Sequence, residues 1–229
     1  MKALYNLEYN EFKKLVEKKL HIDGWLVHDD SASSRSDQVA DRRYFVELKK
    51  RAYEKGINAH KNEILSWLDT LNLLYYALKM VNNKFLDEMQ IIQEYTIPLT
   101  NKRADYMLVR KNKILIIEFS FDKLGEEYKF ETKLSQAVNY KELLSNLLPS
   151  YIKIGTYTFM INPEVDHNGD NIYKYNKYRK TEQLANNEKI DELGAYINLF
   201  FSDRDDAIYQ LGFLEGYVDG LEDKVISGE

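Results

Sequence analysis

The sequence predicts an α/β fold in which helices come first and strands follow, and three observations predict it. The 229 residues contain three prolines, Pro98, Pro149 and Pro163, so the first 97 residues can form helices without interruption. Within that region, Asn62–Val81 repeats leucine and tyrosine at the helical spacings of three and four. From Met89 onward, short runs of β-branched and aromatic residues predict strands.

Each element follows from the same rules of periodicity and chain breaking. In chain order we expect a charged helical segment (Met1–Lys19), a loop (Trp25–Gln38), helices (Asp37–Lys55 and Asn62–Val81), strands (Ile91–Pro98, Arg103–Arg110 and Lys113–Ser120), a helix (Tyr128–Leu147), a strand (Tyr151–Ile161) and helices (Glu182–Phe200 and Asp203–Lys224). This order divides the chain into an N-terminal helical region (1–88), an α/β core (89–180) and an acidic helical C-terminal region (181–229), which we expect to pack as one domain.

The composition predicts a soluble cytoplasmic protein. The chain has no cysteine, which excludes a disulfide framework, a zinc ribbon and a thiol nucleophile. Its longest apolar stretch, Leu71–Val81, is interrupted by Asn72 and Lys79 and is far shorter than the roughly 20 residues of a membrane span. We therefore expect no membrane association.

The net charge of −5 is unevenly distributed along the chain. Residues 181–229 hold 12 acidic and 3 basic residues, which is a net charge of −9, and residues 1–180 hold 29 basic and 25 acidic residues, which is +4. The body of the protein is therefore mildly basic and compatible with a polyanionic partner. The acidic C-terminal helices are either a solvated tail or a contact for a protein partner or a second copy of the chain.

Two acidic residues face each other in the predicted hairpin around Lys111 and Asn112. A two-residue loop there pairs positions whose numbers sum to 223, and Asp105 with Glu118 is such a pair. Two carboxylates about 5 Å apart repel each other, so one must be protonated, or a cation or a metal must bind them. Oxygen ligands on neighbouring strands suit Mg²⁺ or Mn²⁺.

A structural ion cluster explains the same residues. The register places Arg103 opposite Ser120, one step further along the same face, and the guanidinium of Arg103 could neutralise the two carboxylates. The residues alone leave the metal site and the ion cluster equally open.

The ordered arrangement of Asp105, the apolar strand ending in Glu118, and Gln136 with Tyr140 four residues later resembles the PD-(D/E)XK nuclease superfamily, in its branch with a QxxxY helix. The runs IPLTNKRADYMLV and IIEF, with NEILSWLDTLNLL before them, are similar to the nuclease-like region that precedes the helicase in some bacterial proteins. The resemblance covers about residues 37–161.

The resemblance implies a restriction-endonuclease-like fold, a mixed sheet with helices on both faces, and a metal-dependent phosphodiesterase. It implies that Asp105 and Glu118 hold Mg²⁺ or Mn²⁺ and that Glu94 adds a third acidic ligand. Gln136 and Tyr140 would lie beside the site and position substrate or support the metal ligands.

Ser120 departs from the family pattern, which has lysine two residues after the glutamate. That lysine orients the attacking water and offsets charge in the transition state, and a hydroxyl alone cannot do so. Lys123 and Lys133 are the candidates for a lysine that has moved to a neighbouring element, and Lys133 lies one helical turn before Gln136.

Basic and aromatic residues alternate in Tyr173–Lys180, a pattern typical of single-stranded nucleic-acid binding and also of an exposed amphipathic segment. The candidate nucleic-acid contacts are Lys102, Arg103, Lys174, Lys177 and Arg179. The sequence thus favours a divalent-metal-dependent nuclease acting on DNA in defence, mobile-element or repair processes. The alternative is a catalytically inactive nuclease-fold module that binds DNA or a protein partner.

Overall fold

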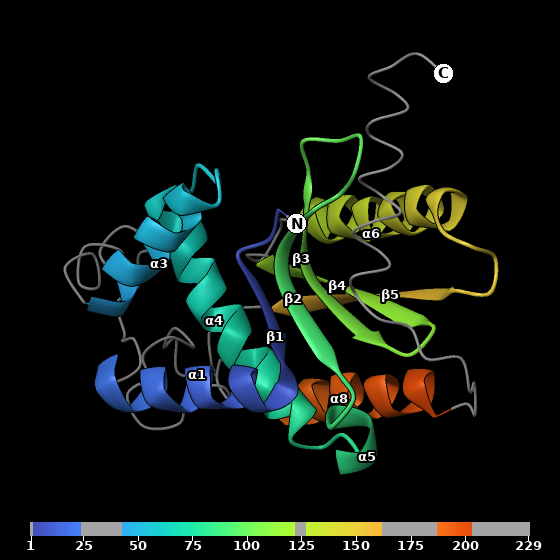
Figure 1. Cartoon of the computed structure of the whole chain (residues 1–229), viewed down its shortest axis with the longest axis horizontal. Coiled ribbons are helices and arrows are strands. Elements are labelled where there is room, and N and C mark those ends of the chain that lie inside the picture. Colours follow the sequence, from blue (N-terminus) through green and yellow to red (C-terminus); the bar gives the residue numbers. More distant parts are fainter. Residues whose placement is uncertain (1, 24–42, 122–126, 162–186, 203–229) are drawn as a thin grey trace.

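The computed structural model describes residues 2–23, 43–121, 127–161 and 187–202 and shows a mixed α/β fold around a five-stranded sheet. Figure 1 shows this sheet with helices on both of its faces. The elements are β1 (Tyr5–Glu8), α1 (Tyr9–Asp23), α3 (Arg43–Glu54), α4 (Lys61–Leu78), α5 (Asn83–Leu86), β2 (Gln90–Thr96), β3 (Arg103–Arg110), β4 (Lys113–Phe121), α6 (Glu127–Leu147), β5 (Lys153–Ile161) and α8 (Asn187–Phe201). No helix in these ranges is long and apolar enough to cross a membrane.

The strands follow one another across the sheet in the order β1-β2-β3-β4-β5. The first three pairings are antiparallel, and β5 runs parallel to β4 after the crossover through α6. The hairpin register is the one expected, because Tyr106 pairs with Ile117 and Arg110 with Lys113. Its two-residue turn is closed by Lys111 in a left-handed conformation, φ 53°.

The N-terminus differs from the expectation, because residues Tyr5–Glu8 of the expected helical segment Met1–Lys19 form the edge strand β1. Tyr5 pairs with Gln93 and Glu8 with Gln90, so the sheet takes one of its strands from the N-terminal region. Four residues with alternating burial can be a strand only when a partner strand supplies the hydrogen bonds.

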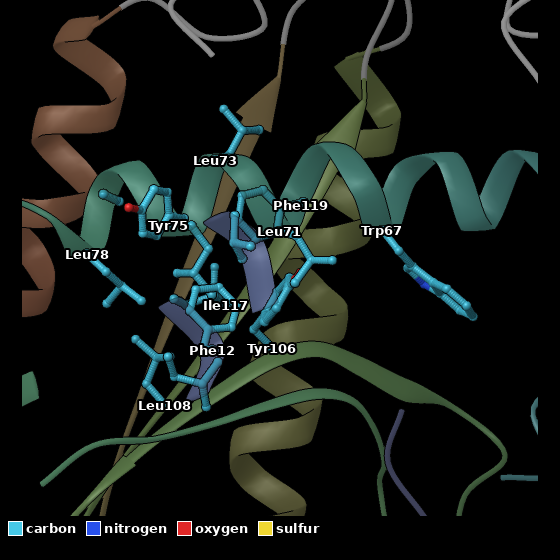
Figure 2. Close-up of a cluster of buried hydrophobic side chains, with 14 of the residues drawn as sticks. Phe12, Trp67, Leu71, Leu73, Tyr75, Leu78, Tyr106, Leu108, Ile117 and Phe119 are labelled. Carbon is cyan, nitrogen blue, oxygen red and sulfur yellow. The ribbon is translucent and has the colours of Figure 1, made fainter. Parts of the chain in front are cut away.

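Two hydrophobic cores lie on opposite faces of the sheet. On one face, α1, α3, α4 and α8 contribute to a large core with Tyr106, Leu108 and Ile117 of the sheet. Figure 2 shows α4 side chains such as Leu71 above these strand residues. On the other face, Tyr140 and other apolar residues of α6 cover a smaller core. Because both faces are covered, the central strands are apolar on both sides.

Helix α4 crosses one end of the sheet and contributes one face to a cleft. Its start follows from its sequence, since the backbone N–H of His60 donates to Glu63 Oε2 at 3.4 Å, which satisfies one of the free donors at the helix N-terminus. Thr70, one turn after Trp67, donates to the Trp67 carbonyl oxygen and lies 3.2 Å from the hydroxyl of Tyr106 in β3. This contact fixes α4 against the sheet beside the acidic residues.

Candidate functional site

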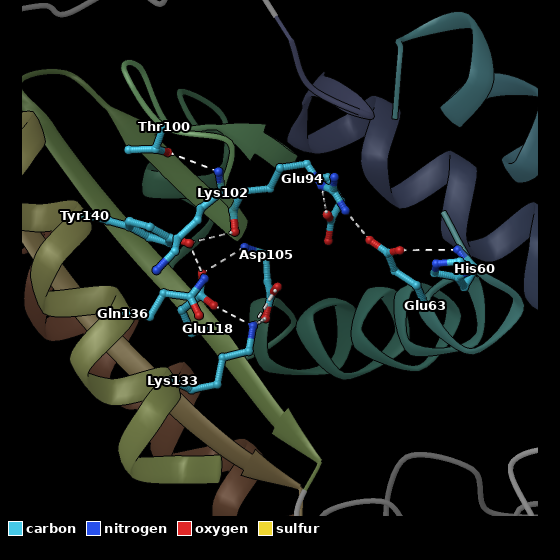
Figure 3. A network of polar contacts seen from close by, with 11 residues as sticks. His60, Glu63, Glu94, Thr100, Lys102, Asp105, Glu118, Lys133, Gln136 and Tyr140 are labelled. Carbon is cyan, nitrogen blue, oxygen red and sulfur yellow. Dashed lines mark hydrogen bonds and ion pairs between the residues drawn. The ribbon is translucent and has the colours of Figure 1, made fainter. Parts of the chain in front are cut away.

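Adjacent strands bring Asp105 and Glu118 together where the β3–β4 ladder ends. Beyond the Tyr106–Ile117 pair, side chains replace the backbone ladder. The backbone N–H of Asp105 donates to Glu118 Oε1 at 3.0 Å, and the backbone N–H of Phe119 donates to Asp105 Oδ2 at 2.8 Å. Each carboxylate is thus held by the opposite strand, and the hairpin fixes their relative position (Figure 3).

Glu118 is completely buried, with 0% of its surface exposed. Burial first, and then the negative charge of Asp105, raise the pKa of its carboxyl to about 8, although the ammonium of Lys133 opposes the shift. At neutral pH, a carboxyl with so high a pKa keeps its proton unless more positive charge lies close to it. The position therefore favours a proton or an added cation.

Lys133 of α6 contacts both carboxylates. Its Nζ lies 3.1 Å from Asp105 Oδ1, 3.0 Å from Asp105 Oδ2 and 2.7 Å from Glu118 Oε2. Burial disfavours the charged form of Lys133, but the attraction of Asp105 and Glu118 outweighs it and raises the pKa above its ordinary value. The structure therefore places Lys133, one of the two lysines considered at the sequence level, at the acidic pair.

Arg103 does not neutralise Asp105 and Glu118, contrary to the ion-cluster interpretation. Its Nε donates to Glu94 Oε2 at 2.8 Å, and its guanidinium also contacts Glu63 Oε1 of α4. Arg103 is thus held between Glu63 of α4 and the buried Glu94 of β2. The cation that pairs with the two carboxylates is Lys133.

Glu94 lies in β2 between the pairs Gln93–Tyr106 and Tyr95–Ala104, which places it beside Asp105. Its φ of 55° is left-handed, an uncommon conformation for glutamate. Burial first, and then the negative charge of Asp105, raise the pKa of Glu94 to about 8, although Arg103 opposes the shift. Glu94 is thus electrostatically linked to Asp105, although its side-chain hydrogen bond is with Arg103.

Gln136 and Tyr140 connect α6 to β3 rather than to the carboxylates. The Gln136 amide donates to the Tyr140 hydroxyl, which donates to the carbonyl oxygen of Arg103 at 3.3 Å. Burial is the largest cause that raises the pKa of Tyr140 to about 12, so the hydroxyl keeps its proton. These two residues position the backbone two residues before Asp105.

A cleft of about 630 Å³ opens between α4, α6 and the ends of β2, β3 and β4, and Asp105 and Lys133 line it whereas the buried Glu118 lies behind its wall. Its basic side chains are those of Lys102, Arg103 and Lys133, and buried Ser120 also contributes to the wall. Lys123, Lys174, Lys177 and Arg179 lie outside the described residues. The remaining lining residues are Glu63, Ser66, Trp67, Thr70, Glu94, Asn101, Asp105, Phe119, Thr132 and Gln136.

The α4 residues of this cleft are the part of the site that the sequence analysis did not identify. Glu63, Ser66, Trp67 and Thr70 share one helical face, which a spacing of three and four could have indicated. No residue pattern, however, shows that this face meets Arg103.

The charges of the cleft fit a divalent cation. Four carboxylates, those of Glu63, Glu94, Asp105 and Glu118, are paired with two cations, which leaves two negative charges when all are ionised. In the described ranges, no three histidine or acidic side chains form a group that could hold a metal alone. Mg²⁺ commonly uses one or two carboxylates and completes its coordination with water and phosphate oxygens, so the donor set fits that ion.

Comparisons with protein-family models, with curated proteins and with solved structures found no match for this chain.

Proposed function

We propose that this protein is a divalent-metal-dependent nuclease with a restriction-endonuclease-like fold that hydrolyses phosphodiester bonds of DNA in the cytoplasm. The observation that carries the proposal is the convergence of Asp105 and Glu118, from paired strands, on one ammonium group in an open cleft. The order of two antiparallel hairpin strands, a helix and a parallel strand supports the same class. Defence, mobile-element and repair processes all use such an activity.

In this proposal Asp105 and Glu118 hold Mg²⁺ or Mn²⁺ through their carboxylate oxygens, with Glu94 as a nearby third carboxylate. A bound divalent cation supplies Lewis-acid activation of water and of the phosphoryl group. Lys133 takes the part that Ser120 cannot, because its ammonium can orient the attacking water and offset negative charge on the phosphoryl oxygens. Gln136 and Tyr140 hold the strand that carries Asp105.

Substrate binding would use the basic groups at the cleft. Lys102 lies on its wall and Arg103 connects two of its sides, so phosphate oxygens can approach from the open end. The backbone N–H of Lys102 donates to Thr100 Oγ1 at 3.1 Å, which orders the loop that presents this lysine.

The test is cleavage of double-stranded and single-stranded DNA in Mg²⁺ or Mn²⁺, with EDTA as the blank. We expect Asp105→Asn and Glu118→Gln each to lower cleavage by at least about a hundredfold, since each removes a charged oxygen ligand from the transition state. Glu131→Gln, an exposed carboxyl on α6, is the matched control and should leave cleavage unchanged. Undiminished cleavage by both site variants would refute the assignment.

A second candidate function, a DNA-binding module without catalysis, is favoured by one observation. Lys133 already pairs with both carboxylates, and Ser120 stands at the position of the usual lysine. This module would bind DNA with a strong salt dependence, weakened by Lys102→Ala, and would not cleave DNA with any divalent cation. Cleavage that requires Asp105 would exclude it.

A further inference from the structure

The Nζ of Lys133 occupies the point where the available carboxylate oxygens converge. Glu118 Oε1 accepts a hydrogen bond from the backbone of Asp105, and Asp105 Oδ2 accepts one from the backbone of Phe119. The two oxygens not bound by backbone groups, Glu118 Oε2 and Asp105 Oδ1, both lie within 3.1 Å of Lys133 Nζ. A cation that binds both carboxylates through these two oxygens would use the atoms that Lys133 contacts.

We propose that Lys133 is an internal competitor that sets the affinity of this site for its divalent cation. The inference depends on the proposed function, because it assumes that Asp105 and Glu118 hold the metal. When the metal binds, the ammonium must leave the convergence point, since an ammonium and a divalent cation a few ångströms apart repel each other strongly in a site of low dielectric.

The surroundings of Lys133 allow such a displacement. The side chain comes from α6 and is 28% exposed, whereas the carboxylate of Glu118 is fully buried and held by backbone. Lys133 also lines the cleft of about 630 Å³, so its ammonium can move into solvent or toward a substrate phosphate. The lysine is therefore the movable member of the cluster, and the carboxylates are the fixed ones.

This displacement connects the two parts that Lys133 plays. An ammonium released from the carboxylates stays within one side-chain length of the metal site, where the proposed reaction needs a positive group beside the water. Binding of the cation would thus both fill the site and free the lysine.

The first experiment measures Mn²⁺ binding by isothermal titration calorimetry near pH 7.5, without DNA. We expect Lys133→Met and Lys133→Gln to bind Mn²⁺ at least about tenfold more tightly than the original protein, because the competing charge is gone. Two variants are used because either may lose thermal stability, and circular dichroism selects the folded one. Lys133→Arg keeps the charge and should not tighten binding, and Lys141→Met, an exposed lysine on the same helix, controls for general charge effects.

The second experiment follows the lysine itself in the unmodified protein. Acetylation of Lys133 by an amine-reactive ester, read by peptide mass spectrometry, should accelerate several-fold when Mn²⁺ is added, because an ammonium that leaves the two carboxylates becomes accessible to the reagent. The rate at Lys141 should not change.

The outcomes separate the inference from the function. Tighter binding in the neutral variants with faster acetylation of Lys133 supports the inference. Equal or weaker Mn²⁺ binding in those variants, with Mn²⁺-dependent cleavage intact in the original protein, overturns the inference and leaves the nuclease assignment standing. No Mn²⁺ binding by any of these proteins overturns the metal site together with the inference.

Discussion

Glu118→Gln should change the way in which folding stability depends on pH. The carboxyl of Glu118 has an ordinary pKa of 4.5, and burial followed by the charge of Asp105 raises it to about 8 in the folded protein. Between these values the folded state keeps the proton and the unfolded state has lost it. The contribution of Glu118 to stability must therefore fall as the pH rises through this window.

The slope follows from one retained proton. One unit of pKa corresponds to about 1.4 kcal/mol, so between about pH 5.5 and pH 7.5 Glu118 alone lowers the free energy of unfolding by about 2–3 kcal/mol. Glutamine does not titrate, so the variant should lose this contribution. The pKa of Glu94 is also raised to about 8, so Glu94 contributes a fall of stability with pH in both proteins.

The assay is urea unfolding in EDTA at several pH values, followed by circular dichroism. The two proteins are compared by how their stability changes with pH, not by absolute stability. The NH₂ group of glutamine would face another donor, either the Asp105 N–H or Lys133, and this lowers stability at every pH. Glu131→Gln should keep the slope of the original protein. Stability that is flat or rises with pH in EDTA, or an equal slope in Glu118→Gln, would refute the reasoning about burial.

Three further predictions concern neighbouring residues. Tyr140→Phe removes the hydroxyl that donates to the Arg103 carbonyl, so urea unfolding should show a loss of about 1 kcal/mol, and DNA cleavage should fall more than DNA binding does. Ser120→Ala should leave Mn²⁺-dependent cleavage within about threefold of the original protein if Lys133 supplies the positive group, and a loss as large as that of a ligand variant would contradict this. Gly194→Ala should lower the free energy of unfolding by about 1–3 kcal/mol, because a Cβ there would lie 2.9 Å from the Ala77 carbonyl oxygen, and calorimetry should show unchanged Mn²⁺ affinity.

The sequence predicts the parts of the fold that depend on local periodicity. The leucine spacing predicts helix α4, and the two-residue turn at Lys111 predicts the register of the β3–β4 hairpin. Both predictions use only the local sequence, and both are confirmed. Strand β1 was not predicted, because four residues among charged neighbours become a strand only through pairing with β2. The four-residue helix α5 was missed for a similar reason, since so short a helix carries no period.

The contacts of the site also divide into those that the local sequence predicts and those that depend on packing. The hairpin register predicts that Asp105 meets Glu118, because both belong to one local unit. The partner of Arg103 could not be predicted, since Glu63 comes from a helix 40 residues away in sequence whose path across the sheet is set by core packing. Lys133 is an intermediate case. The sequence makes it one of two candidate lysines, because it lies one turn before Gln136, and the packing of α6 brings it to the carboxylates.

The burial of Glu118 and the position of Lys133 are connected, because a buried carboxylate needs a cation beside it. A buried carboxylate such as that of Glu118, which lies in β4 between β3 and β5, cannot be ionised at low cost unless a cation reaches it, and that cation can be a proton, an ammonium, a guanidinium or a metal ion. In this chain the ammonium belongs to Lys133 of α6, which lines a cleft. Lys133 pairs with both carboxylates and is also 28% exposed, so another cation can replace it. A lysine on the same strand as Glu118, two residues later, would lie beside the carboxylate without having to move. Because Ser120 occupies that place, the proposed metal binding would also release the ammonium of Lys133, and the Mn²⁺ affinity should respond to Lys133 more strongly than to Lys102 or Arg103, the other basic residues of the cleft.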